Sequence, residues 1–241
     1  MLCALLAMAP QDQARLLSDP ERAAPWVKAA AEAGLPEAQL RHGRWLLERG
    51  EAGAALRQFQ RAARAGEPDA WNMVGRCLEN GWGMAADARR AARWYVRAAR
   101  AGHAWGQYNL GHLLLDGLGV AQDLEAAHGW YLRAADQGHP RAMNLVARCL
   151  EEGWGVRADP AAARDWLRRS AEAGYFRGQF NYATVLAGEG RPDEAATLFA
   201  AALEGAPEPT RGHMAAMLAA RREPALSAMG RAALEGTGPC S

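Results

Sequence analysis

The chain has 241 residues, half of them hydrophobic, and a formal net charge of +1. This near balance lacks the strong basic excess that is typical of nucleic-acid binders, so we expect no nucleic-acid partner. Ile is absent, and Ala, Leu, Arg and Glu are frequent, which predicts an all-α protein because most of these residues are good helix formers.

The first 20 residues begin with a short apolar run, MLCALLAMAPQDQ. No Lys or Arg precedes this run, which argues against a secretory signal, and no window reaches the ~18 apolar residues of a membrane span. We therefore predict an N-terminal capping helix over residues 1–20, no membrane span and a cytoplasmic location. Reduced thiols are expected there, and the cysteines lie far apart in the sequence, at Cys3, Cys77, Cys149 and Cys240.

An internal repeat organises the middle of the chain. Equivalent starts at Ala70, Gly106, Ala142 and Gly178 lie 36 residues apart. Two shorter copies flank this block, each lacking four residues around a glycine-rich loop. The repeats predicted within a region spanning residues 21–210 are 38–69, 70–105, 106–141, 142–177 and 178–209. Residues 211–241 are expected to add C-terminal capping helices and a flexible tail.

Each repeat is predicted to form two helices, the first of about 11 residues, as in Ala70–Asn80. A Gly-x-Gly loop such as ENGWGMAAD then follows, because glycine tolerates the left-handed conformation that ends a helix. An Asp at the end of the loop is expected to cap the second helix. We expect one Trp of each second helix to pack between neighbouring helices, namely Trp94, Trp130 and Trp166.

The segments GWGMAA and GWGVRA also fit a dinucleotide-binding pattern. That pattern binds a pyrophosphate only when it follows a strand and opens a helix. Here a predicted helix precedes each loop and no β-rich segment lies nearby. We therefore interpret the loops as architecture and expect no cofactor.

The stretch GQYNLGHLLLDGLGVAQDLEAAHGWYLRAADQGH, from Gly106 to His139, resembles the Sel-1-like repeat family, relatives of the tetratricopeptide repeats. The resemblance extends over about residues 21–210. It implies a right-handed α-solenoid of about five helix pairs. It also implies a non-catalytic adaptor or scaffold that binds a protein or peptide partner along a concave groove.

No catalytic constellation is evident in the sequence. None of the serines lies in a nucleophile-elbow pattern, and the six histidines form no metal-ligand cluster, so we expect neither catalysis nor a metal. His103 and His139 follow the closing glycines and are expected to cap helices. Two alternatives remain from the resemblance: a hydrolase of the cysteine-rich, β-lactamase-like group, and an accessory protein of a bacterial iron-uptake system. The cysteine pair within each repeat that marks the first group is absent.

A polar stripe on the first helices is the candidate partner-binding groove. Helical periodicity places the third, fourth, seventh and eleventh residues of each first helix on one side, opposite the apolar positions. The alternative is an ordinary solvated face, and binding of a second copy of the chain also stays open. The candidate residues are Arg44, Asn72, Arg76, Asn80, Asn109, His112, Asp116, Asn144, Arg148, Glu152 and Asn181.

Overall fold

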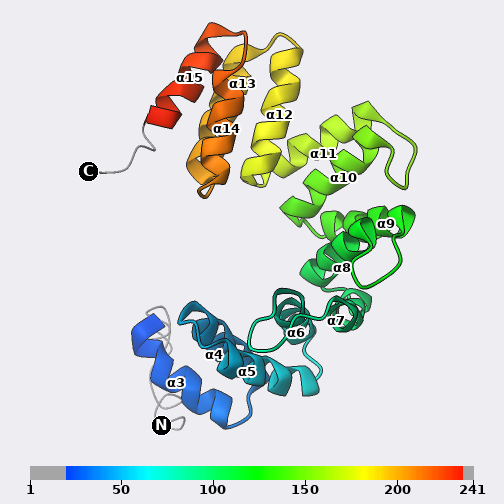
Figure 1. Ribbon diagram of the computed structural model, residues 1–241, viewed down its shortest axis with the longest axis vertical. Coiled ribbons are helices and arrows are strands. Elements are labelled where there is room, and N and C mark those ends of the chain that lie inside the picture. The colour runs from blue at the N-terminus through cyan, green and yellow to red at the C-terminus, as the bar shows by residue number, and fades with distance from the viewer. Residues whose placement is uncertain (1–19, 236–241) are drawn as a thin grey trace. The chain divides into compact units, whose positions relative to one another are not determined.

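The computed structural model describes residues 20–235, and every element in that range is a helix. Thirteen helices are described there, and consecutive helices pack against each other within each part of the chain (Figure 1). The predicted all-α repeat class is thereby confirmed. The N-terminal cap predicted over residues 1–20 and the tail after residue 235 fall largely outside the described range. None of the described helices is long and apolar enough to span a membrane.

The chain divides into two compact units, with the boundary between Asp123 and Leu124. The helices of the first unit are α3 (Pro20–Glu32), α4 (Pro36–Glu48), α5 (Ala52–Arg64), α6 (Pro68–Asn80), α7 (Ala88–Arg100) and α8 (Ala104–Asp116). Those of the second are α9 (Leu124–Asp136), α10 (Pro140–Glu152), α11 (Pro160–Glu172), α12 (Phe176–Gly188), α13 (Pro192–Gly205), α14 (Thr210–Ala219) and α15 (Pro224–Glu235).

The first helices begin about two residues earlier than the sequence suggests. In α6 and α10 the first residue is a proline, Pro68 and Pro140, whose missing N–H has no helical partner to lose at this position. The ends agree with the prediction: Gly81, Gly117 and Gly153 adopt left-handed conformations with φ of 71°, 69° and 71°. A proline start and a glycine stop therefore delimit these helices locally.

The loop aspartates cap the second helices as predicted. The carboxylate of Asp87 accepts a hydrogen bond from the backbone N–H of Arg90 at 2.9 Å, and Asp159 accepts one from Ala162 at 3.0 Å. The backbone N–H of each Asp also bonds back to the first helix, as from Asp87 to Leu78 O at 2.8 Å. The loop is thus closed at both ends by hydrogen bonds.

The second glycine of each loop touches the preceding repeat. A Cβ placed on Gly83 would lie 2.6 Å from the carbonyl oxygen of Ala52, at the start of α5. The same addition at Gly119 would meet the carbonyl carbon of Ala88 at 2.4 Å. Only glycine fits between the two backbones, so the loop is an inter-repeat contact.

The core of each helix pair is filled by one large residue facing one small residue. Tyr95 of α7 is fully buried, and its ring lies against Gly75 of α6, where an added Cβ would meet it at 2.6 Å. Phe59 of α5 lies in the same way against Gly43 of α4. The absence of a side chain on the first helix therefore makes room for the ring of the second.

The prediction for the repeated tryptophans was wrong. Trp94, Trp130 and Trp166 are all half-buried, and the residue after each is the one that fills the core: Tyr95, Tyr131 and Leu167. The arginine three residues after each Trp lies over the half-buried Trp ring, as Arg169 does at 3.9 Å from the centre of the Trp166 ring. One residue corresponds to 100° of helix rotation, so the core position was misplaced by that angle.

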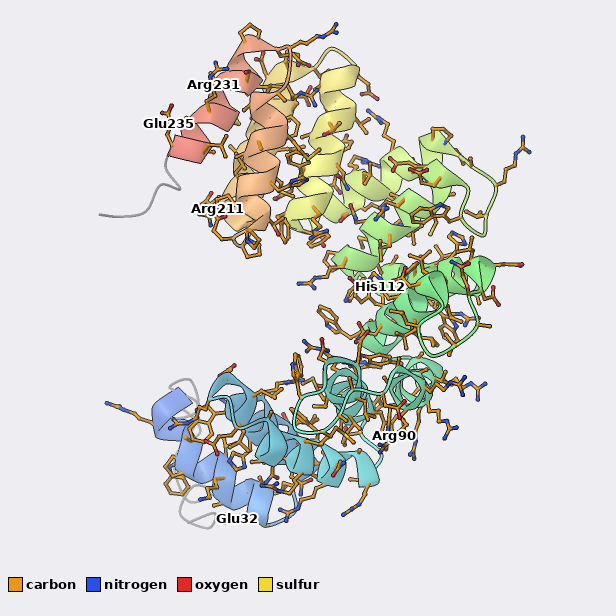
Figure 2. The ribbon with its side chains drawn as sticks, in the orientation of Figure 1. Glu32, Arg90, His112, Arg211, Arg231 and Glu235 are labelled. Carbon is orange, nitrogen blue, oxygen red and sulfur yellow. The ribbon has the colours of Figure 1, made fainter. Side chains whose placement is uncertain are left out.

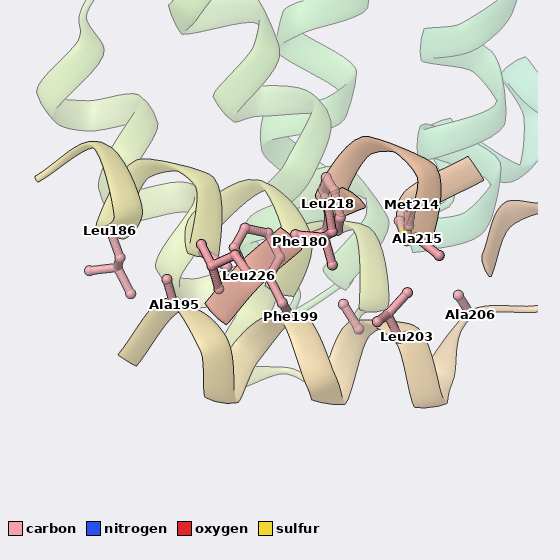
Figure 3. Packing of buried hydrophobic residues seen from close by; sticks show 12 residues of the cluster. Phe180, Leu186, Ala195, Phe199, Leu203, Ala206, Met214, Ala215, Leu218 and Leu226 are labelled. Carbon is pink, nitrogen blue, oxygen red and sulfur yellow. The ribbon is translucent and has the colours of Figure 1, made fainter. Parts of the chain in front are cut away.

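Four helices of the second unit share a continuous apolar core (Figure 3). The rings of Phe180 and Phe199 meet edge to face at 5.1 Å between centroids, joining α12 to α13. Leu218 of α14 and Leu226 of α15 complete this cluster and are almost fully buried. Burial of these side chains holds the last two helices on the repeats.

Candidate functional site

The eleven predicted residues are divided between the two units. Seven of them lie on α4, α6 and α8 of the first unit: Arg44, Asn72, Arg76, Asn80, Asn109, His112 and Asp116. Four lie on α10 and α12 of the second unit: Asn144, Arg148, Glu152 and Asn181.

Two of the predicted asparagines are buried. Asn72 is 4% exposed and Asn144 is 5% exposed, which corrects the expectation that they face solvent. The Nδ2 of Asn109 donates to Oδ1 of Asn72 at 2.8 Å, and Asn181 makes the same bond to Asn144, also at 2.8 Å. These asparagines link successive first helices, because a buried amide must find a hydrogen-bond partner.

An arginine stacked on a tryptophan occurs at the same place in each unit. The guanidinium of Arg76 lies over the ring of Trp82 at 5.1 Å, and that of Arg148 lies over Trp154 at 4.9 Å. Both rings are half-buried at the surface. The guanidinium and ring are therefore held together as a flat, partly exposed pair by cation–π attraction.

Arg44 belongs to a row of polar contacts across three first helices. It forms an ion pair with Asp69 in the first turn of α6, and the other oxygen of Asp69 lies 3.8 Å from Nε2 of His103. His103 caps α8, as predicted, because its Nδ1 accepts a hydrogen bond from the N–H of Gly106 at 3.1 Å. Burial lowers the pKa of His103, which favours the neutral imidazole that this cap requires. Sequence reasoning missed Asp69, whose only signal is its place directly after Pro68.

The remaining polar candidates lie near the C-terminal ends of the first helices. Asn80 is exposed, and its amide donates to the carbonyl of Arg76 at 2.9 Å. Asp116 and Glu152 are the exposed last residues of α8 and α10. Both carboxylates are therefore exposed to solvent and lie next to the left-handed glycines Gly117 and Gly153.

An aromatic row on α8 includes His112 and was not predicted. The ring of His112, labelled in Figure 2, meets Tyr108 edge-on at 4.7 Å, and Tyr108 meets Trp105 at 5.8 Å. Trp105 is 43% exposed, so part of its ring faces solvent. The spacing of three and four residues in the sequence was the available signal.

The cysteines of the first helices are internal. Cys77 and Cys149 are free thiols with at most 1% exposure, and burial raises the pKa of each to about 11. A thiol in this state is protonated at neutral pH and a poor nucleophile. Cys3 and Cys240 lie outside the described residues.

Sequential helix pairs, joined by capped glycine loops and linked through first-helix asparagines, define a tandem helical-repeat protein. A sequence model described as "Sel1 repeat" matches residues 3–35, 36–67, 68–103, 106–139 and 140–175. The chain therefore belongs to the Sel1 repeat family. Three of these stretches begin where α4, α6 and α10 begin, at Pro36, Pro68 and Pro140.

Solved structures share this fold. A Sel1 repeat protein from Oxalobacter formigenes is 27% identical, with a TM-score of 0.68 over 77% of this chain and 76% of that one. The protective antigen c5321 of uropathogenic Escherichia coli, which displays an SLR fold, is 24% identical, with a TM-score of 0.69. That match covers 91% of this chain and half of the antigen.

A more distant likeness is to the immunity protein Pa5087 from Pseudomonas aeruginosa. It is 15% identical, with a TM-score of 0.56 over 83% of this chain and 78% of that protein. A search of curated proteins found no match to the chain. The comparisons therefore establish the family and fold.

Proposed function

We propose that this Sel1 repeat protein is a non-catalytic adaptor of the cytoplasm that binds a partner protein through the exposed faces of its first helices. The recurrence of one surface arrangement in both units carries the proposal. Arg76 over Trp82 in the first unit corresponds to Arg148 over Trp154 in the second. Helical repeats of this kind commonly present such surfaces to other proteins.

The chemistry of the pair suits a protein partner. Arg and Trp are the residue types, with Tyr, that most often dominate the binding energy of protein interfaces. Stacking on the ring reduces the freedom of the guanidinium before binding, so less conformational entropy is lost when a partner carboxylate or carbonyl is engaged. The Asn72–Asn109 bond stabilises the surrounding helix faces from beneath.

The hydrolase alternative draws no support from the described cysteines. That group relies on a disulfide within each repeat, whereas Cys77 and Cys149 are free and buried. No residue of the chain bears specifically on the iron-uptake alternative.

The test is affinity capture from native lysate with quantitative mass spectrometry. The variant Arg76→Glu, Arg148→Glu reverses both stacked charges. The matched control Arg157→Glu, Arg222→Glu makes the same change in charge at two exposed arginines. Circular dichroism and thermal unfolding check that all three proteins are equally folded.

We expect a partner that is captured by the wild type and the control and is lost with the first variant. Equal capture by both variants would overturn the assignment to the first-helix faces. Specific hydrolysis of a β-lactam reporter would overturn the non-catalytic part of the proposal.

A further inference from the structure

Helix α7 is rich in arginine. Five of its 13 residues are arginines, and the helix contains no acidic residue. All five are exposed: Arg89, Arg90, Arg93, Arg97 and Arg100. Figure 2 labels Arg90 on this helix. Four of them follow a spacing of three, four and three residues, which places them in one stripe about 15 Å long.

Acidic side chains do not neutralise this stripe. Within residues 22–235, none of the five arginines makes an ion pair or a side-chain hydrogen bond with a carboxylate. Arg97 instead lies over two rings, at 4.2 Å from Trp71 and 5.9 Å from Trp94. Like charges four residues apart destabilise a helix, so the stripe costs stability in the free protein.

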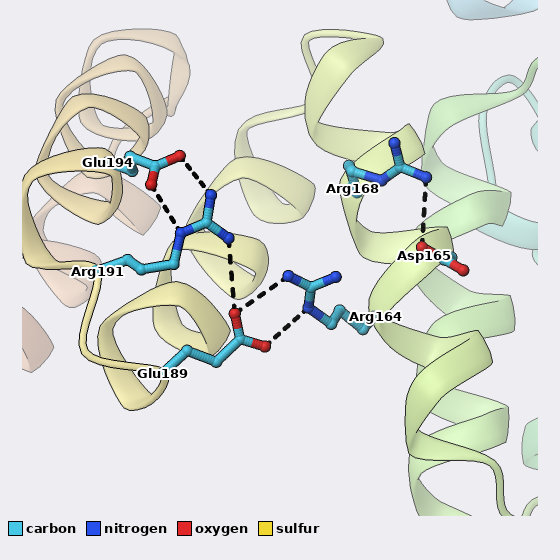
Figure 4. Close-up of polar contacts among 6 residues, drawn as sticks. All are labelled: Arg164, Asp165, Arg168, Glu189, Arg191 and Glu194. Atoms are coloured by element: carbon cyan, nitrogen blue, oxygen red, sulfur yellow. Dashed lines mark hydrogen bonds and ion pairs between the residues drawn. The ribbon is translucent and has the colours of Figure 1, made fainter.

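The arginines of α11, the helix 72 residues after α7 in the sequence, are paired with acidic side chains. There Arg164 makes a two-pronged pair with Glu189 at 2.8 and 3.1 Å (Figure 4). Arg168 lies 3.3 Å from Asp165 and 3.8 Å from Glu172. Arg164 and Arg168 of α11 therefore have carboxylate partners, whereas no arginine of α7 has one within residues 22–235.

Two surface hollows meet on α7 at Arg93. The larger, of about 780 Å³, lies between α7 and the loop after α8. Its lining includes Arg89 and Arg93 and the apolar side chains of Ala92, Val96, Val120 and Ala121. The smaller, of about 320 Å³, is lined by Arg90, Arg93, Trp94 and Arg97. Cationic groups therefore flank an apolar floor on one side and an indole ring on the other.

We propose that this α7 face binds an acidic segment of a partner protein in which carboxylates flank an apolar side chain. The planar guanidinium matches a carboxylate through two parallel hydrogen bonds. The apolar side chain fills the hollow beside Val96 and Val120, removing apolar surface from water. The positive charge of the arginines favours acidic residues in the partner. The apolar lining of the larger hollow favours a protein segment over a phosphate chain, because a phosphate chain has no apolar side chain to bury there.

This inference goes beyond the proposed function because it concerns a second helix, whereas Arg76 and Arg148 lie on first helices. The two are independent. A partner lost on changing Arg76 and Arg148 supports the first-helix site whatever happens at α7.

The experiment uses the full chain and a fluorescein-labelled peptide, Glu-Glu-Leu-Glu-Glu-Leu-Glu-Glu, followed by fluorescence anisotropy. Two control peptides replace every Glu by Gln, or every Leu by Ser. The test variant is Arg90→Glu, Arg93→Glu, and the charge-matched control is Arg157→Glu, Arg222→Glu, all exposed positions. Circular dichroism verifies folding. An oligothymidine of similar length serves as a competing nucleic-acid probe.

We expect the Glu peptide to bind the wild type and the control, with affinity at least about tenfold weaker for the α7 variant and for the Gln peptide. The Ser peptide should bind several-fold more weakly, and added salt should weaken all charged binding. No binding of the Glu peptide up to about 1 mM would overturn the proposal. So would equal binding of the Gln peptide, tighter binding of the oligothymidine, or a loss confined to the Arg76→Glu, Arg148→Glu variant.

Discussion

Asn109 donates a hydrogen bond to the buried Asn72 over 2.8 Å, joining α8 to α6. The identical bond from Asn181 to Asn144 joins α12 to α10 in the other unit. Four asparagines of the row that the sequence suggested for binding a partner therefore hold neighbouring repeats together.

Replacing Asn72 by Ala is expected to destabilise the protein by about 1–3 kcal/mol, because the amide of Asn109 loses its acceptor at a mostly buried site. Urea unfolding followed by circular dichroism measures the change. Asn80→Ala is the matched control, since Asn80 is exposed and bonds only within its own helix, and it should change stability by less than about 0.5 kcal/mol. Equal effects of the two substitutions would contradict the structural role.

Two left-handed glycines, Gly102 after α7 and Gly119 in a Gly-x-Gly loop, allow the cost of backbone strain to be measured separately from the cost of a lost inter-repeat contact. Gly102→Ala adds a Cβ at φ 85° with nothing within 4 Å, so only the left-handed backbone is strained, at roughly 1–2 kcal/mol. Gly119→Ala adds the same strain at φ 71° and also a clash with the backbone of Ala88. We expect it to cost about 1–3 kcal/mol more. Thermal unfolding of the two variants side by side decides, and equal losses would show that the contact is unimportant.

Because Leu167 and not Trp166 fills the core, truncating the smaller of these two adjacent side chains is expected to cost more stability. Leu167→Ala, at a position 1% exposed, should destabilise by about 2–5 kcal/mol. Trp166→Ala should cost about 1 kcal/mol although it removes more atoms, because the ring is only half-buried and covered by Arg169. Denaturant midpoints measure both. A larger loss for the Trp variant would restore the original assignment.

Thiol reactivity tests burial and its pH dependence. In a Cys3→Ser, Cys240→Ser background, Cys77 and Cys149 should not react with a thiol reagent near pH 8 until the protein is unfolded, because a thiol with a pKa of about 11 is almost fully protonated there. Since folding raises this pKa, the folded state holds its proton more tightly. The associated stability is therefore present below the pKa of the unfolded thiol and is lost as the pH rises toward 11. Rapid labelling of native protein near neutral pH would contradict the burial.

Most of the local structure was predictable. Proline, glycine and aspartate act on the backbone within a turn of the chain, so helix ends and caps at Gly81, Asp87 and His103 can be inferred without knowing any neighbour. The candidate site was less predictable. Periodicity placed the candidates on the correct helices. It did not predict the burial of Asn72 and Asn144, because these side chains lie at the edge of the polar face, where a neighbouring helix can cover them.

The sequence by itself determined the all-helical class, the repeat length, the loop chemistry and the family, because these depend on local backbone preferences and on spacings that recur along the chain. Only the tertiary structure decided that Tyr95 and not Trp94 fills the core, that Asn72 bridges to Asn109, and that no arginine of α7 forms an ion pair within residues 22–235. Those outcomes depend on which helix covers each face, and the covering helix comes from another repeat. The physical reason is that burial and charge pairing are properties of contacts between segments distant in sequence, which helical periodicity alone does not specify.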